Sequence, residues 1–128
     1  MVISSDLQAA RRVEEALLGQ VSARGYGEAA QFAIKLALEE GLNNAIKHGN
    51  GYDPDKNVRV EFDVNGDRAI IVITDEGRGF TPDAVPDPTA DENLERPCGR
   101  GLMLMRAYMD EVSFNDQGNQ VRMVKRNA

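Results

Sequence analysis

Two polar side chains four residues apart, Glu40 and Asn44, interrupt a largely apolar segment near the middle of the sequence. In a helix this spacing puts both on one face, and His48 continues the same ridge one turn later. The amide oxygen of Asn44 suits Mg²⁺, and the Glu40 carboxylate can accept a proton from a water or a hydroxyl. A solvated helix face would explain the same spacing, so both interpretations remain open at this point.

A second polar site is predicted where an apolar strand ends, at the segment Asp75-Glu76-Gly77-Arg78-Gly79. A carboxylate there can accept a hydrogen bond from an exocyclic amine such as that of adenine. The two glycines would let a ligand approach the bare backbone closely. The alternative is a simple turn, because glycines commonly follow a strand.

A third site is predicted at Gly99-Arg100-Gly101, which precedes a helical pattern. Free backbone amides and the helix dipole favour an anion at such a position. Arg96, Arg100 and Arg106 lie close enough in sequence to add positive charge. A hinge between a loop and a helix is the alternative interpretation.

The elements that must position these residues follow from the hydrophobic periodicity. Helices are predicted from a Ser5 or Asp6 cap to about residue 21, over about 28–48 and over 102–109, and a Pro-rich loop over 81–97. Strands are predicted over 58–64, 69–74, 111–116 and 120–125, with a short strand at 2–4 and a hairpin turn at Asn65-Gly66. This order predicts an α+β two-layer sandwich, with a mainly antiparallel sheet covered on one face by helices.

Composition narrows the class of protein further. The chain has 128 residues, which predicts one domain (1–128). Its net charge of −6 and pI near 4.8 argue against sequence-independent binding of nucleic acid. A single cysteine, Cys98, and a single histidine exclude an internal disulfide and a cysteine or histidine metal cluster. No apolar run approaches a membrane span and no signal layout is present, so a cytoplasmic location is expected.

The order of the three polar segments resembles the GHKL (Bergerat) ATP-binding fold shared by gyrase, Hsp90, MutL and histidine-kinase ATP domains. Glu40–Ala45 is similar to its N box, Asp75–Phe80 to its first glycine box and Gly99–Leu102 to its second. Within that superfamily the chain most resembles the anti-sigma-factor serine kinases of the RsbW and SpoIIAB type. Their Asn-Ala-x-x-His-Gly extension of the N box is matched by Asn44–Gly49.

The resemblance implies a role for each matching residue. Glu40 matches the N-box glutamate and would be the general base, and the adjacent Glu39, about 100° around the helix, is the weaker candidate. Asn44 would hold Mg²⁺, and Asp75 would recognise the adenine amine, with Gly77 and Gly79 lining the pocket. The ATP lid would span about 81–98. Further contacts with the nucleotide are implied for Lys47, His48, Arg96, Gly99, Arg100, Gly101 and Leu102.

The implied activity is transfer of a phosphoryl group from ATP, with Mg²⁺, to a serine of a STAS-type anti-anti-sigma protein. The group also binds sigma factors and commonly forms homodimers, and no nucleic acid or membrane partner is expected. Two alternatives are a nucleotide-gated binding module without kinase activity and a histidine-kinase-like ATPase domain cut from a longer protein. The start at Met1 and the end soon after the last strand favour a stand-alone unit. Gly118-Asn119 departs from the Gly-Thr that the family often carries there.

Overall fold

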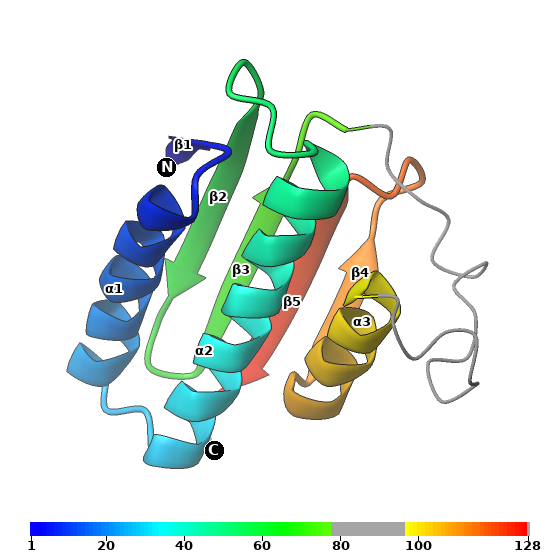
Figure 1. The fold of residues 1–128 in the computed structure, drawn as a ribbon. Coiled ribbons are helices and arrows are strands. Elements are labelled where there is room, and N and C mark those ends of the chain that lie inside the picture. The colour runs from blue at the N-terminus through cyan, green and yellow to red at the C-terminus, as the bar shows by residue number, and fades with distance from the viewer. Residues whose placement is uncertain (78–96, 128) are drawn as a thin grey trace.

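The computed structural model of the chain describes residues 1–77 and 97–127. Its sheet has five antiparallel strands in the order β1-β2-β3-β5-β4. The strands are β1 (Val2–Ser4), β2 (Asn57–Val64), β3 (Arg68–Thr74), β4 (Glu111–Phe114) and β5 (Gln120–Arg126). The short first strand at residues 2–4 is present and lies at one edge of the sheet (Figure 1).

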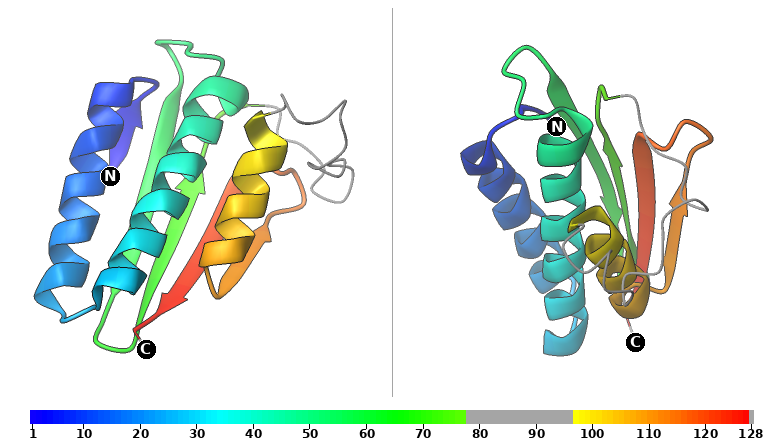
Figure 2. Two further views of the ribbon diagram at one scale, coloured as in Figure 1. Left: turned by 60° about the horizontal axis from the view of Figure 1, so that its bottom comes forward. Right: turned by 45° about the vertical axis from the view of Figure 1, so that its right-hand side comes forward.

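The helices of the described residues form the second layer. They are α1 (Leu7–Ala23), α2 (Glu28–Asn43), which continues as the π-helix η1 (Asn44–Gly49), and α3 (Pro97–Tyr108). All of them lie on the same face of the sheet, and the two further views show a two-layer arrangement (Figure 2). The predicted α+β sandwich with helices on one face is therefore confirmed.

The core lies between these two layers, because each element turns its apolar stripe toward the other layer. Alternate residues of β3 are buried, among them Ile71 and Ile73, and they pack with α2 residues such as Leu38. The opposite face of β3 is also apolar, which explains why the strand was predicted to be central. There Val72 is half-buried between the cross-strand neighbours Glu61 and Arg122.

Three boundaries differ from the prediction. The third helix begins at Pro97 rather than at residue 102, and proline is well suited to a first helical turn because its missing N–H needs no helical acceptor there. The helix expected over 28–48 changes to π geometry at Asn44. The β2–β3 turn lies at Gly66-Asp67, flanked by Asn65 and Arg68, because the Asn65 side chain accepts hydrogen bonds from the N–H groups of Asp67 and Arg68.

A buried tyrosine ties the α1–α2 connection to this β2–β3 turn. Tyr26 is 3% exposed, and its hydroxyl donates a hydrogen bond of 2.8 Å to the Asn65 carbonyl oxygen. The loop between the first two helices is thereby fixed to the β2–β3 turn, although Tyr26 and Asn65 are 39 residues apart.

We predict that Tyr26→Phe lowers the free energy of unfolding by about 1 kcal/mol, because the buried hydrogen bond is lost. Tyr52→Phe is the matched control, since Tyr52 is 51% exposed and should tolerate the change without measurable loss. Urea unfolding with unchanged m-values measures both effects. Equal midpoints for the two variants would show that the Tyr26 hydroxyl contributes nothing.

Candidate functional site

A pocket of about 360 Å³ opens at the end of the molecule where α2 continues into η1. Four segments that are distant in sequence meet there: the α2–η1 helix, the end of β3, α3 and the β4–β5 hairpin (Figure 1). The lining residues are Gly41, Asn44, Ala45, His48, Gly49, Ile73, Asp75, Met105, Phe114, Gly118, Asn119, Gln120 and Val121. Its apolar walls with a few converging polar groups are typical of a small-molecule site.

The backbone around Asp75 is held by three successive N–H groups with three different acceptors. The Asp75 N–H donates to the Asn119 carbonyl at 2.9 Å, and the Glu76 N–H donates to Asn50 Oδ1 at 2.8 Å. The Gly77 N–H donates to Asp75 Oδ1 at 2.8 Å. The turn that carries this carboxylate is therefore held by the β4–β5 loop, by the residue that follows η1 and by its own hydrogen bond.

Two glycines pack so closely against Asp75 that neither has room for a side chain. A Cβ on Gly49 would lie 2.4 Å from the Asp75 carboxylate, and a Cβ on Gly77 would lie 2.0 Å from the Gly49 carbonyl oxygen. No role beside Asp75 was predicted for Gly49 from the sequence. The signal for its role was its place directly after His48 in the Asn-Ala-x-x-His-Gly match.

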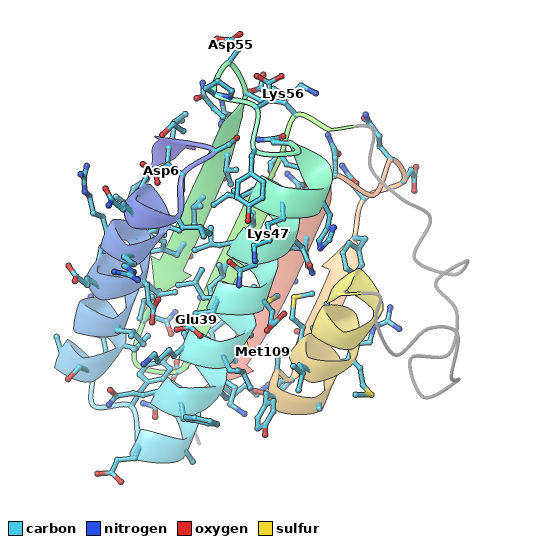
Figure 3. All side chains as sticks on the ribbon, in the orientation of Figure 1. Asp6, Glu39, Lys47, Asp55, Lys56 and Met109 are labelled. Atoms are coloured by element: carbon cyan, nitrogen blue, oxygen red, sulfur yellow. The ribbon has the colours of Figure 1, made fainter. Side chains whose placement is uncertain are left out.

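Burial raises the pKa of Asp75 above that of an ordinary carboxyl, because the charged form is desolvated. The Gly77 N–H and the positive charge of Lys56 act in the opposite direction and partly offset this pKa rise. Lys56 lies in the loop between η1 and β2 (Figure 3). A carboxylate with few waters around it is a strong acceptor for a ligand donor, since water competes less for it.

The polar residues Glu39, Glu40 and Asn44 of the α2–η1 helix differ in what they contact. Asn44 is half-buried and lines the pocket, and its side chain makes no hydrogen bond with the described residues. Glu40, one turn earlier, is also half-buried but is not among the lining residues. Glu39 (labelled in Figure 3) instead hydrogen-bonds Glu14 of α1, which together with the greater effect of burial raises the pKa of Glu14.

Of the other predicted site residues, some line the pocket, some do not, and some lie outside the described residues. His48 is exposed and lines the pocket, whereas the neighbouring Lys47 is exposed and does not. Gly79, Arg96 and the predicted lid up to residue 96 lie outside the described residues. The second glycine segment, with Gly99, Arg100, Gly101 and Leu102, lies within the first turns of α3. Only N–H groups of the first turn lack helical acceptors, which includes Gly99 but not Gly101.

Asn119 occupies the position where the family often has threonine, and it ties the β4–β5 hairpin to the site. Its side-chain Nδ2 donates to the Asp75 carbonyl at 3.2 Å, and its Oδ1 accepts from Asn115 Nδ2 at 2.7 Å. The next residue, Gln120, donates through Nε2 to Thr74 Oγ1 at 3.0 Å. Amide groups therefore make the contacts between the last two strands and the end of β3.

Among the described residues, no three His, Cys, Asp or Glu side chains gather into a group that could hold a metal ion. An Mg²⁺ ion here would depend on an amide oxygen such as that of Asn44, on phosphate oxygens and on water, which is an ordinary ligand set for Mg²⁺. In the same parts of the chain, no helix is long and apolar enough to cross a membrane.

Comparison with known proteins identifies relatives along nearly the whole chain. Residues 3–125 match the family described as the histidine kinase-like ATPase domain. The serine-protein kinase RsbW of Bacillus subtilis is 34% identical over 85% of this chain and 72% of its own length. The RsbW of Listeria monocytogenes is 28% identical over 93% of this chain and 84% of its own length.

A crystal structure of the RsbU and RsbW domains of a Mycobacterium tuberculosis protein has a similar fold. Its TM-score is 0.57 at 19% identity, and the match covers 99% of this chain and 31% of that longer one. This chain thus spans about a third of that protein.

The chain belongs to the histidine kinase-like ATPase domains and, within them, to the serine-protein kinases of the RsbW type. The family and the enzyme class predicted from the sequence, a protein serine kinase, are confirmed.

We predict that Gly49→Ala weakens ATP binding by at least about tenfold, because the new methyl group must displace the Asp75 carboxylate. Gly19→Ala is the matched control: its Cβ would meet nothing within 4 Å in the helix α1, so it should keep full affinity and gain up to about 1 kcal/mol of stability. Calorimetric titration with ATP measures the affinities. Unchanged affinity in Gly49→Ala would contradict the close packing inferred at Asp75.

We also predict how Asp75→Asn changes stability with pH. Because the pKa of Asp75 is raised in the folded state, ionisation of this carboxyl opposes folding as pH rises through and above the carboxyl range. The stability of Asp75→Asn relative to the unsubstituted protein should therefore increase from acidic to neutral pH. Thermal unfolding of the ligand-free proteins across this range measures the difference, and a decrease toward neutral pH would contradict the assigned burial effect.

Proposed function

We propose that this chain binds Mg²⁺·ATP in the pocket and transfers the γ-phosphoryl group to a serine of a STAS-type anti-anti-sigma protein. We further propose that it binds a sigma factor as an alternative partner, which would make it an anti-sigma factor. The observation that carries the proposal is that one pocket is lined by both Asn44 and Asp75. These are the residues implied for metal binding and for adenine recognition.

The Asp75 side of the pocket suits an adenine base. A carboxylate that accepts from the exocyclic amine would select adenine, since a hydrogen-bonding site discriminates strongly against a base without that donor. Apolar side chains of Ile73, Met105 and Val121 also line the pocket and can pack against a planar ring. The restricted room beside Gly49 and Gly77 leaves the carboxylate few alternative positions.

The α2–η1 side of the pocket suits the phosphates. The Asn44 amide oxygen has no other partner among the described residues and would be a ligand of Mg²⁺, which when bound neutralises phosphate charge. The N–H of Gly99 belongs to the first turn of α3, and a helix N-terminus favours an anion. Phosphates would therefore lie between the ends of the two helices.

The chemical step needs a group that removes the proton of the serine hydroxyl. In the proposed reaction the serine oxygen forms a bond to the γ-phosphorus, the bond to the β–γ bridging oxygen breaks, and ADP leaves with that electron pair. Glu40 would accept the hydroxyl proton as general base. Glu40 is half-buried one turn before Asn44, the proposed metal ligand, and this proximity in the helix supports the assignment although Glu40 does not line the pocket.

We predict that Glu40→Gln retains Mg²⁺·ATP binding but lowers phosphate transfer by at least about 100-fold, because the proton acceptor is lost. The matched control is Glu39→Gln, whose carboxyl faces Glu14 of α1 and should leave transfer within about twofold of the original rate. The measurement is incubation with γ-labelled ATP and STAS proteins encoded near this chain, followed by identification of the labelled residue.

Three outcomes would decide between the proposed activities. A labelled serine that disappears in Glu40→Gln supports the kinase and the base. Full labelling in Glu40→Gln would contradict the role of Glu40. Nucleotide-dependent binding of every STAS partner without any label would contradict phosphoryl transfer and favour a binding module gated by nucleotide.

A further inference from the structure

We propose that Asn50 is a positioning residue that links the edge strand β1 to the Asp75 carboxylate and so sets the preference for adenine. The inference rests on the proposed function, in which Asp75 recognises the base. It concerns a residue outside the three motifs, one that does not line the pocket.

Asn50 is 3% exposed, and its side-chain amide is fully engaged in hydrogen bonds. Its Nδ2 donates to Ser5 Oγ at 3.1 Å and to the Asn57 carbonyl at 2.9 Å. Its Oδ1 accepts from the Glu76 N–H at 2.8 Å. Both donors and the acceptor therefore have partners on three different segments, and no apolar or charged residue of similar size can make the same set of bonds.

The Ser5 side of this network belongs to the sheet edge. Ser5 connects β1 to the cap of α1, is 8% exposed and donates through Oγ to the Lys56 carbonyl at 2.8 Å. Asn57, which also bonds Asn50, pairs with Ser4 in the register of β1 and β2. The Asn57 N–H donates in addition to the Glu76 carboxylate. The strand β1 is thus connected to Glu76 both through Asn50 and through Asn57.

The Glu76 side of the network belongs to the turn that carries Asp75. Without the Asn50 amide, the Glu76 N–H would lose its acceptor, and water would have to enter or the turn would have to move. Gly49 and Gly77 pack closely against the Asp75 carboxylate, so a shifted turn is expected to shift Asp75 as well. A hydrogen bond to a base depends steeply on the position of the acceptor, so the effect should fall on base recognition.

A buried asparagine that only stabilised the fold would behave differently. It would change the fraction of folded protein but leave the relative affinities of the folded protein for two bases unchanged. The discriminating quantity is therefore the ratio of the dissociation constants for ITP and ATP, because inosine carries a carbonyl oxygen where adenine carries its amine. A carboxylate accepts from the amine but not from the carbonyl.

The experiment compares this ratio in the unsubstituted protein, Asn50→Ala, Asn127→Ala and Asp75→Asn by calorimetric titration in the presence of Mg²⁺. Asn127 is the matched control, since its side chain also donates to a backbone carbonyl, that of Gly66 at 2.8 Å, at the opposite end of the sheet. We expect a ratio of at least about 10 in the unsubstituted protein and in Asn127→Ala. We expect a ratio below about 3 in Asn50→Ala and in Asp75→Asn.

Ser5→Ala keeps the test decisive if Asn50→Ala does not fold. It removes one of the three partners of Asn50 while retaining the bond to Glu76, so the ratio should fall by a smaller factor, about twofold. An unchanged ratio in a folded Asn50→Ala, or in Ser5→Ala where Asn50→Ala is unfolded, would overturn the positioning role while leaving adenine recognition by Asp75 intact. A ratio near 1 in the unsubstituted protein would instead contradict adenine recognition itself, and the role of Asn50 with it.

Discussion

The constraint on which the site depends is the confinement of one carboxylate at the end of the central strand. Asp75 follows β3, and its N–H donates to the Asn119 carbonyl in the β4–β5 loop. The N–H of the next residue, Glu76, donates to Asn50, which follows η1. Gly49 and Gly77 pack beside the Asp75 carboxylate, where a side chain at either position would clash. Desolvation of this carboxylate is unfavourable for folding, and retaining such a group in a pocket is characteristic of functional sites.

The rest of the fold can be understood as support for that arrangement. The helix α2 crosses β3 closely at Gly41, where a Cβ would lie 2.6 Å from Ile73 Cδ1, and this close packing brings Asn44 to the pocket wall. The change to π geometry occurs at Asn44 itself, and π turns within helices are frequent at functional sites. The hairpin β4–β5 closes another wall through the amide of Asn119.

The sequence predicted the architecture because its apolar periodicity is strong and uninterrupted in each element. The strand 69–74 was correctly predicted to be central, since Ile70 and Val72 are apolar on the face that carries no helix. The motif order also led to the family, which the comparisons confirm. Boundaries were less predictable where a single side chain decides them. Asn65 moves the hairpin turn by one residue through its own hydrogen bonds, and Pro97 starts α3 within the predicted loop.

The contacts around the site were much less predictable than the motifs. The local sequence around Gly49 and Asn50 does not show that they contact the turn at Asp75 and Glu76, about 26 residues further on. Their roles follow from tertiary packing, since one provides space and the other provides hydrogen bonds between segments. Asn119 stands where a threonine hydroxyl was expected. Its side-chain amide instead donates to the Asp75 carbonyl, a contact that becomes visible only once the strands are placed.

The most direct test of this account is a crystal structure of the protein with Mg²⁺ and a non-hydrolysable ATP analogue. The account predicts the adenine amine at about 2.7–3.2 Å from the Asp75 carboxylate and the metal ion at about 2.1 Å from the Asn44 amide oxygen. A nucleotide bound outside this pocket, or bound in it with phosphates beside Asp75 and the base beside Asn44, would contradict it.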